Sequence, residues 1–292
     1  MDSITIPTPD AVALPRPSTA SFTVRIEPPR RMFELRLREL WAYRELLYFF
    51  IWRDVKIRYK QTAIGVAWVV LQPLLTMLVA TLFFGKLAKL PSDGLPYAVF
   101  SFAAVVPWMY FSNALLNITN VIVDNQRVIT KVYFPRLILP FSATLSGLVD
   151  FTIGLVVLVI FCLSYHIYPT PAVLLLPFFF LLAVFTVLGV GLWLSALNAL
   201  YRDVRYLIPF FTQFWMLASP VYYPSSMVPQ RYRWLYALNP MVGVIDGFRW
   251  GLTGHGQAPG SAMYVSIAVV FVAVLAGLIF FNRMEGAIAD RV

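Results

Sequence analysis

Long apolar segments alternate with short polar ones along most of this chain. Six of the apolar segments are poor in charge, and their lengths are close to or above the roughly 20 residues that a helix needs to cross a hydrocarbon core of about 30 Å. We predict a transmembrane helix in each, over residues 66–84, 97–123, 137–163, 172–200, 206–223 and 262–281. The third segment is interrupted by Asp150, and the fifth contains Pro209 and Pro220.

The pattern changes before the first of these segments. Residues 32–52 mix charged residues with an apolar repeat of helical spacing at Leu40, Tyr43 and Leu47. This favours an amphipathic helix lying in the membrane interface, with packing of the same helix on other protein as the alternative. Four cations follow within eight residues, namely Arg53, Lys56, Arg58 and Lys60. This basic collar completes a unit over residues 32–60, and it can meet anionic lipid headgroups or phosphate-bearing cargo.

Two further segments are predicted to be helical without crossing the membrane. Residues 125–135 predict a short helix that Asp124 or Asn125 caps and Pro135 ends, with a plain connecting turn as the alternative. Residues 220–260 are too polar to span the membrane and too apolar for a free loop, which predicts two short re-entrant helices, 229–238 and 241–252. A simple cap over the spans is the alternative. Irregular backbone at membrane depth needs protein or water around it, so the re-entrant interpretation points to a lumen.

The predicted fold class is therefore an all-α polytopic membrane protein. Six transmembrane helices occupy residues 61–292, with an N-terminal amphipathic interface helix before them and short re-entrant helices before the last span. The first 31 residues are polar and rich in proline, and they lack an apolar signal segment. This composition predicts a disordered cytoplasmic arm.

Composition and charge agree with this class and assign the two sides of the membrane. The chain is 60% hydrophobic and 13% charged, against roughly 45–50% and 25% in soluble domains. Most of its 23 lysines and arginines fall on the side of both termini, which predicts that both termini are cytoplasmic. The exceptions are Lys86, Lys89, Arg231, Arg233 and Arg249. The net charge of +9 is then a signal of topology, and we expect no nucleic-acid partner.

Sequence motifs for catalysis are missing from the chain. It has no G-x-x-x-x-G-K-[ST] loop for ATP, no G-x-S-x-G elbow and no H-E-x-x-H pair. The single cysteine, Cys162, and the two histidines are too few for a disulfide framework or a conventional metal cluster. We therefore expect a chain without enzymatic activity, metal or cofactor of its own.

Asp150 and three aromatic residues lie well inside the predicted spans. A carboxylate at the bilayer centre costs about 2.5–3.5 kcal/mol. Asp150 therefore either belongs to a polar track or gate, or is compensated by a hydroxyl or backbone partner where helices meet. Trp108, Tyr110 and Trp215 fall near the middle of the second and fifth spans. Their rings either pack helices together or line a cavity in which they stack on sugar rings.

Four sequence motifs occur in a fixed order along the chain. They are RDVKIRYKQTAIGVAWVVLQP at residues 53–73, NQRVITKVYFPRLILP at 125–140, LVDF at 148–151 and NPMVGVIDGFRWGL at 239–252. Together they resemble the membrane subunits of ABC type-2 exporters, and among these the permeases for O-antigen and teichoic-acid polysaccharides. The resemblance covers residues 35–285.

The resemblance implies a homodimer in the cytoplasmic membrane, bound to two copies of a separate ABC ATPase that holds the ATP and Mg²⁺. The implied cargo is a lipid-linked polysaccharide on undecaprenyl diphosphate, moved outward across that membrane. Residues 125–135 would couple to the ATPase, and residues 225–256 would form an outer gate. The alternatives are an ABC type-2 exporter of a small lipophilic compound and a membrane-embedded polyprenyl-linked sugar transferase or acyltransferase.

Residue roles follow from the same resemblance. The basic collar, Arg53, Lys56, Arg58 and Lys60, is expected where the diphosphate headgroup approaches. The aromatic residues expected to face the glycan are Trp108, Tyr110, Trp215, Tyr222 and Tyr223. The residues expected to contact the ATPase are Arg127, Val128, Ile129, Lys131 and Val132. Asp150 is the intramembrane polar residue, and none is assigned a catalytic or metal-binding role.

Overall fold

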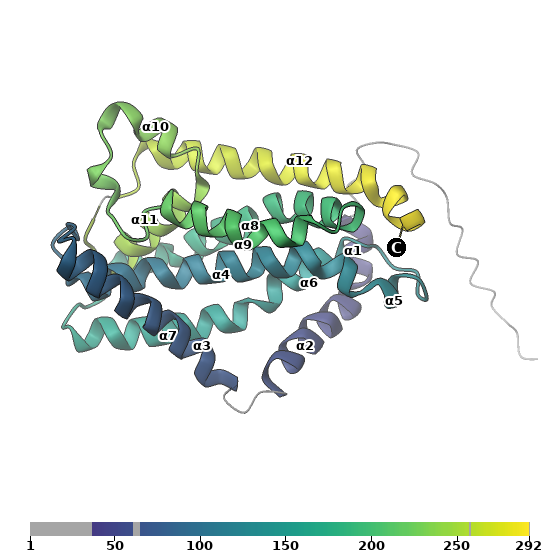
Figure 1. Ribbon diagram of the computed structural model, residues 1–292, viewed down its shortest axis with the longest axis horizontal. Helices are drawn as coiled ribbons and strands as arrows, with labels where there is room; N and C mark the ends of the chain where they lie inside the picture. Colours follow the sequence, from purple (N-terminus) through teal and green to yellow (C-terminus); the bar gives the residue numbers. More distant parts are fainter. Residues whose placement is uncertain (1–36, 61–64, 257, 292) are drawn as a thin grey trace, which may run out of the picture. The chain divides into compact units, whose positions relative to one another are not determined.

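The computed structural model describes residues 37–60, 65–256 and 258–291, and this part of the chain is helical without any strand (Figure 1). The all-α class is thus confirmed. The predicted arm over residues 1–31 and the start of the predicted interface helix, residues 32–36, lie outside the described residues.

The helices follow one another with short connections. In chain order they are α1 (Leu37–Ala42), α2 (Arg44–Lys60), α3 (Gly65–Ala80), the π-helix η1 (Thr81–Leu87), α4 (Tyr97–Asp124), α5 (Gln126–Ile129), α6 (Ile138–Ser146), α7 (Leu148–Ser164), the 3₁₀-helix η2 (Pro171–Leu175), α8 (Leu176–Leu200), α9 (Val204–Leu217), the 3₁₀-helices η3 (Ser225–Met227) and η4 (Gln230–Tyr232), α10 (Arg233–Tyr236), α11 (Pro240–Thr253) and α12 (Ser261–Arg291).

Five helical segments in the described part of the chain are long and apolar enough to cross a membrane. They are Ala67–Leu87, Tyr97–Asp124, Ile138–Ser164, Pro171–Leu200 and Ser261–Gly286. These segments coincide with the first four predicted spans and the sixth. The chain is therefore a multi-pass membrane protein.

The fifth predicted span is shorter in the structure than in the sequence analysis. Helix α9 ends at Leu217, six residues before the predicted end at Tyr223. Its 14 residues correspond to a length of about 21 Å, less than the roughly 30 Å of a hydrocarbon core. Pro220 explains the early end, because proline has no N–H for a helical hydrogen bond and disfavours helical geometry at the preceding Ser219.

Helix α4 is the central element of the fold. It packs against α3, α6, α7, α8, α9 and α11, and most of its side chains from Val99 to Leu115 are buried. In Figure 1, α4 and α8 run alongside each other, and α12 runs alongside α8. Helices α11 and α5 lie at opposite ends of α4. The segments predicted to form the outer gate and the coupling element are thus separated by the length of this helix.

The third predicted span consists of two helices. Helix α6 ends at Ser146 and α7 begins at Leu148, with Gly147 between them. The ring of Tyr110 on α4 approaches this break so closely that a Cβ atom on Gly147 would lie 3.1 Å from Tyr110 Cε2. Glycine therefore allows α4 to pack against the junction.

The N-terminal helices pack on protein with one face and leave another uncovered. Phe50 of α2 is buried and contacts Phe134, with 5.7 Å between the ring centroids. Trp41, Tyr48 and Trp52 are exposed. Helix α2 also continues through the whole basic collar to Lys60. The exposed aromatic face fits the predicted position in the membrane interface, which stays a prediction.

The predicted coupling helix is reduced to one turn, Gln126–Ile129, and does not reach Tyr133. Asn125 does not cap it, since its side-chain amide donates to the carbonyl oxygen of Val121 at 2.8 Å and so belongs to the end of α4. The hydroxyl of Thr130 bonds back to the carbonyl oxygen of Gln126 at 3.1 Å, an interaction that competes with continuation of a helix.

The segment over residues 220–260 is helical in part. The first predicted helix, 229–238, is divided into η4 and α10, whereas the second corresponds to α11. Asn239 caps α11 by accepting a hydrogen bond from Met241 N at 3.0 Å, Pro240 occupies the first turn, and Gly254 ends the helix with φ of 69°.

Close packing between α8 and α12 depends on glycine. A Cβ atom on Gly277 would lie 2.6 Å from the carbonyl oxygen of Gly189, and one on Gly189 would lie 3.0 Å from the backbone of Ala273. Small residues at helix interfaces let backbones approach in this way, and van der Waals contact then holds the helices together in lipid.

We expect Gly277→Ala to destabilise the protein by about 1–3 kcal/mol, because backbone atoms cannot move aside for the added methyl group. The matched control is Gly286→Ala on the same helix, where a Cβ atom would meet nothing within 4 Å. This control should be neutral or slightly stabilising, since alanine favours a helix more than glycine does. Thermal unfolding of the purified protein in detergent measures both, and equal midpoints for the two variants would contradict the assigned packing.

Candidate functional site

A cavity of about 590 Å³ lies between α2, α3, α4 and α7. We call it the Asp150 cavity. Its polar lining residues are Arg58, Tyr59, Gln72, Tyr110, Asn113, Asn117 and Asp150, and its other lining residues are Trp68, Val69, Pro73, Val106, Met109, Leu116, Gly147, Phe151 and Gly154. The size is within the roughly 300–1,000 Å³ of known ligand pockets. The cavity thus combines apolar walls with a small number of polar groups.

Asp150 connects α7 to the end of α2 inside this cavity. Its carboxylate forms an ion pair with the guanidinium of Arg58 and accepts a hydrogen bond from the hydroxyl of Tyr59. Burial raises the pKa of the Tyr59 hydroxyl, and the bond to Asp150 acts in the same direction, so Tyr59 stays a donor. Asp150 therefore has the helix-interface hydroxyl partner that the sequence allowed, together with a cation from the basic collar.

The other collar residues lie against α2 itself. Arg53 forms an ion pair with Asp54 at 2.7 Å, and its guanidinium carbon lies 4.7 Å from the centroid of the Phe50 ring. The ammonium of Lys56 lies 4.1 Å from the centroid of the Trp52 ring, while Lys60 is exposed. The structure therefore does not bring the four cations together around one point. Only Arg58 lines the Asp150 cavity.

The predicted glycan-facing aromatic residues are distributed over several places. Trp108 is buried and packs against Phe111, with 5.3 Å between ring centroids. Tyr110 lines the Asp150 cavity, and its hydroxyl donates to the carbonyl oxygen of Thr144 at 3.3 Å. The ring of Tyr222 stacks on that of Phe84, with 4.6 Å between the ring centroids. The ring of Trp108 therefore packs within α4, and that of Tyr222 joins the segment after α9 to η1.

A second pocket, of about 370 Å³, lies beside Trp215. We call it the Trp215 pocket, and it is lined by Trp215, Ala218, Val228, Tyr232, Leu235, Tyr236 and Asn239. The indole N–H of Trp215 donates to Asn239 Oδ1 at 2.8 Å. Tyr223 does not line this pocket, but its hydroxyl accepts a hydrogen bond from the hydroxyl of Tyr236 at 3.2 Å. Of the aromatic residues predicted to face the glycan, Trp215 is thus the one whose ring lines this pocket, together with Tyr232 and Tyr236.

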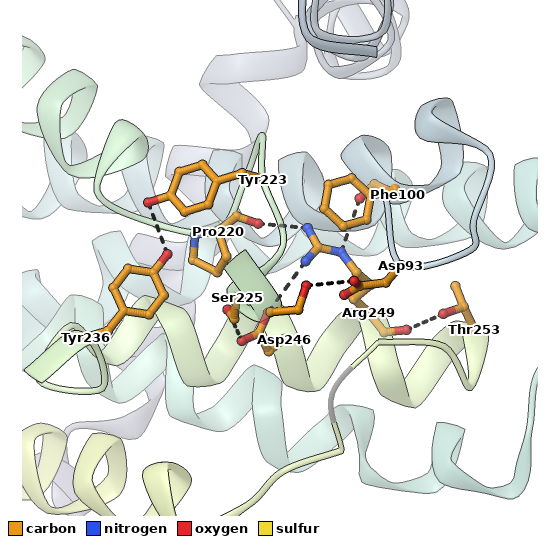
Figure 2. Close-up of polar contacts among 10 residues, drawn as sticks. Asp93, Phe100, Pro220, Tyr223, Ser225, Tyr236, Asp246, Arg249 and Thr253 are labelled. Atoms are coloured by element: carbon orange, nitrogen blue, oxygen red, sulfur yellow. Dashed lines mark hydrogen bonds and ion pairs between the residues drawn. The ribbon is translucent and has the colours of Figure 1, made fainter. Parts of the chain in front are cut away.

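Sequence reasoning missed a polar cluster around Arg249, which is 2% exposed (Figure 2). The Arg249 side chain extends from α11 and donates to the carbonyl oxygens of Pro220 at 2.8 Å and Phe100 at 3.4 Å. Its guanidinium also lies 3.5 Å from Asp246 Oδ1 and covers the ring of Phe100. Asp246 in turn accepts a hydrogen bond from Ser225. The cluster fastens α11 to α4 and to the segment after α9.

The electrostatics of this cluster reflect its burial. Burial raises the pKa of the Asp246 carboxyl to about 6, although the charge of Arg249 acts in the opposite direction. Burial likewise lowers the pKa of the Arg249 guanidinium to about 10, which leaves it charged at neutral pH. The signal that could have revealed the pair is the i,i+3 spacing of an acid and a base within an otherwise apolar segment.

The residues predicted to contact an ATPase surround α5. Arg127, Lys131 and Val132 are exposed, whereas Val128 and Ile129 are partly buried against the core. The structure therefore presents two cations and one apolar side chain outward. Val128 and Ile129 instead pack against the core and hold the turn in place.

Comparison with known proteins identifies relatives over most of the chain. A family described as ABC-2 type transporter matches residues 45–253. An O-antigen export system permease protein RfbA from Myxococcus xanthus is 31% identical over 253 residues, which are 85% of this chain and 96% of that protein. An RfbA protein from Klebsiella pneumoniae is 25% identical over 82% of this chain and 91% of its own length. The polysialic acid transport protein KpsM from Escherichia coli is 20% identical over 80% of this chain and 92% of its own length.

We expect Arg249→Met to destabilise the protein by about 3–5 kcal/mol at neutral pH, because it leaves a buried carboxylate without its cation. The loss should shrink as the pH falls from 7.5 toward 6 and then level off. Asp246 already has a pKa of about 6, and removing the positive charge raises it further, so the carboxyl becomes neutral on acidification. Thermal unfolding between pH 5 and pH 7.5 measures this dependence.

The matched control is Arg231→Met, which removes an exposed cation from the same part of the chain and should change stability by less than about 0.5 kcal/mol at every pH. Adding Asp246→Asn to Arg249→Met should recover part of the loss at neutral pH. A pH-independent loss in Arg249→Met would argue against the assigned pair.

Proposed function

Since the chain belongs to the ABC-2 type transporter family, we propose that it is the permease subunit of an exporter that moves a polysaccharide out across the cytoplasmic membrane. The observation that carries this proposal is similarity over nearly the whole length of relatives named for O-antigen export and polysialic acid transport. The described spans are joined by short connections except over residues 201–260, which hold the short helices α9, α10 and α11. A conduit is therefore a better fit than an enzyme domain.

The energy for export comes from a separate ATPase. The chain has no Walker-type phosphate loop, so ATP and Mg²⁺ bind to that partner and not to the permease. Both termini and the turn around α5 lie on the cytoplasmic side, as the distribution of lysine and arginine indicates. ATP binding by the partner moves the turn around α5. The transmembrane helices then shift from one packing arrangement to another.

The conduit forms between two copies of the permease. Support comes from apolar faces that one copy leaves uncovered, especially on α9, where Phe210 and Phe214 are 66% and 72% exposed. Helix α3 likewise exposes Trp68 and Leu78, and η1 exposes Phe83. Some of this surface meets lipid. The short α9 and the broken segment over residues 218–238 suit the outer end of a path, where irregular backbone can line a water-filled lumen.

The cargo is a polysaccharide on a polyprenyl diphosphate carrier, which approaches along the cytoplasmic interface beside α2. Positive charge at that surface comes from Arg53, Lys56 and Lys60. Arg58 lines the Asp150 cavity next to it. The sugar-transferase alternative would need a carboxylate available for acid–base chemistry near the headgroup. Asp150 fits that role poorly, because both of its oxygens are engaged by Arg58 and Tyr59.

The proposed function is tested with proteoliposomes that contain the permease and the ATPase that co-purifies with it. A lipid-linked glycan is added from outside, and its protection from an external glycosidase is followed with and without ATP. ATP-dependent protection, abolished when the ATPase carries a substitution in its phosphate loop, is the expected result. Protection that ignores ATP, or ATP-driven movement of a small lipophilic dye without any movement of glycan, would refute it.

A second prediction concerns the coupling turn. Lys131→Cys and Val132→Cys, introduced one at a time with the buried Cys162 replaced by Ala, should form crosslinks to cysteines on the co-purified ATPase. Both positions are exposed next to α5. Leu174→Cys is the control, because this residue is 81% exposed in η2, beside α11 and away from α5. Crosslinks at Leu174 but not at Lys131 or Val132 would reverse the proposed orientation.

A further inference from the structure

Three carboxamide side chains line the Asp150 cavity. Asn113 and Asn117 are one helical turn apart on α4, and Gln72 lies across from them on α3. In the described part of the chain, none of these three amide groups forms a hydrogen bond with the protein. They therefore present donors and acceptors to whatever occupies the cavity.

Asn120, Asn198 and Asn239 behave differently. The amide of Asn120 donates to the carbonyl oxygen of Leu116 at 3.0 Å, and that of Asn198 donates to the carbonyl oxygen of Thr119 at 3.0 Å. Asn239 bonds to four separate groups. Polar side chains inside a membrane are costly unless they find partners or line a polar cavity. Gln72, Asn113 and Asn117 instead line a cavity, where a ligand can supply these partners.

The charges of the cavity favour a ligand without net charge. The guanidinium of Arg58 already faces the carboxylate of Asp150, and the second carboxylate oxygen accepts the hydroxyl of Tyr59. The strongest anion-binding and cation-binding groups thus satisfy each other. What the cavity offers a ligand is neutral hydrogen bonding from groups that both donate and accept.

The apolar walls favour a flat ligand with both polar edges and apolar faces. Trp68, Tyr110 and Phe151 bring aromatic rings to the cavity. Hydroxyl groups of a sugar, like carboxamides, both donate and accept hydrogen bonds, while the C–H face of a sugar ring packs on an aromatic ring. A sugar residue matches this combination of groups better than a fatty chain or a bare phosphate does.

We propose that the Asp150 cavity is a carbohydrate-binding subsite, in which Gln72, Asn113 and Asn117 bind the hydroxyl or acetamido groups of an uncharged sugar residue of the cargo. This inference rests on the proposed export of a glycan and assigns a place where part of it is held. The Arg58–Asp150 pair closes the end of the subsite formed by α2 and α7. Trp68 is 53% exposed, so the cavity is reached from the side of the bundle.

The test uses the complete permease with its co-purified ATPase and a photoreactive probe, dodecyl β-D-glucoside with a diazirine on the alkyl carbon next to the glycosidic oxygen. Mass spectrometry of the labelled peptides locates the probe. We expect labelling in α3 and α4 near Val69 and Met109, and competition by dodecyl β-D-maltoside. The triple variant Gln72→Leu, Asn113→Leu, Asn117→Leu should reduce this labelling at least tenfold.

The triple variant should fold, because leucine is more favourable than a carboxamide in a membrane span. The matched control is Thr76→Val combined with Ser112→Ala. These hydroxyls lie on the same two helices but bond to the carbonyl oxygens of Gln72 and Met109, at 3.0 and 3.3 Å, and do not line the cavity. The control should be labelled like the unmodified protein.

A matching dodecylphosphocholine probe separates a sugar site from a lipid-headgroup site. Equal labelling by both probes, unaffected by the three leucines, would overturn the proposal. Glycan export that proceeds normally in the triple variant, together with unchanged labelling, would refute the subsite and leave the proposed function intact. Conversely, amide-dependent labelling in a complex that exports no glycan would support the subsite and count against the proposed function.

Discussion

Polar groups at membrane depth must be satisfied by protein or by a polar cavity, and this constraint governs how the helices around α4 are arranged. The segment after α9 has irregular backbone, yet Arg249 donates to the carbonyl oxygen of Pro220, and Asn239 donates to Ala218 and caps α11. These bonds allow a broken segment to exist beside the spans. Without them the backbone carbonyl groups of Ala218 and Pro220 would lose these partners, and α11 would lose contacts that hold it on α4.

The ion pairs Arg249–Asp246 and Arg58–Asp150 meet the same constraint in different ways. Arg249 and Asp246 belong to one short helix, and Arg249 is almost completely enclosed, so this pair acts as a fixed fastener. Arg58 and Asp150 belong to helices far apart in the sequence and border a cavity. Both side chains of the second pair keep some access to solvent, so their charges can be hydrated when the pair breaks. Breaking it therefore costs less free energy than breaking the first pair. If α2 moves when a partner binds, this contact is the one able to open.

Hydropathy was sufficient to predict the positions of five spans, because each crosses the membrane as one apolar run. The end of α9 at Leu217 depends on Pro220, and the single turn of α5 on a local hydrogen bond of Thr130; a pattern of apolar residues encodes neither. For the candidate site, composition indicated that Asp150 needs a partner. It could not identify Arg58, since ninety-two residues separate the two and only tertiary packing brings them together.

The length of α9 has a consequence for the surrounding lipid. A helix of 14 residues is about 9 Å too short for a typical hydrocarbon core, and Tyr206, Phe210 and Phe214 are exposed along it. Such hydrophobic mismatch is relieved by thinning of the adjacent leaflet. If α9 crosses the membrane and part of it meets lipid, the membrane beside it is locally compressed, and acyl-chain length then acts on the protein from outside its own sequence.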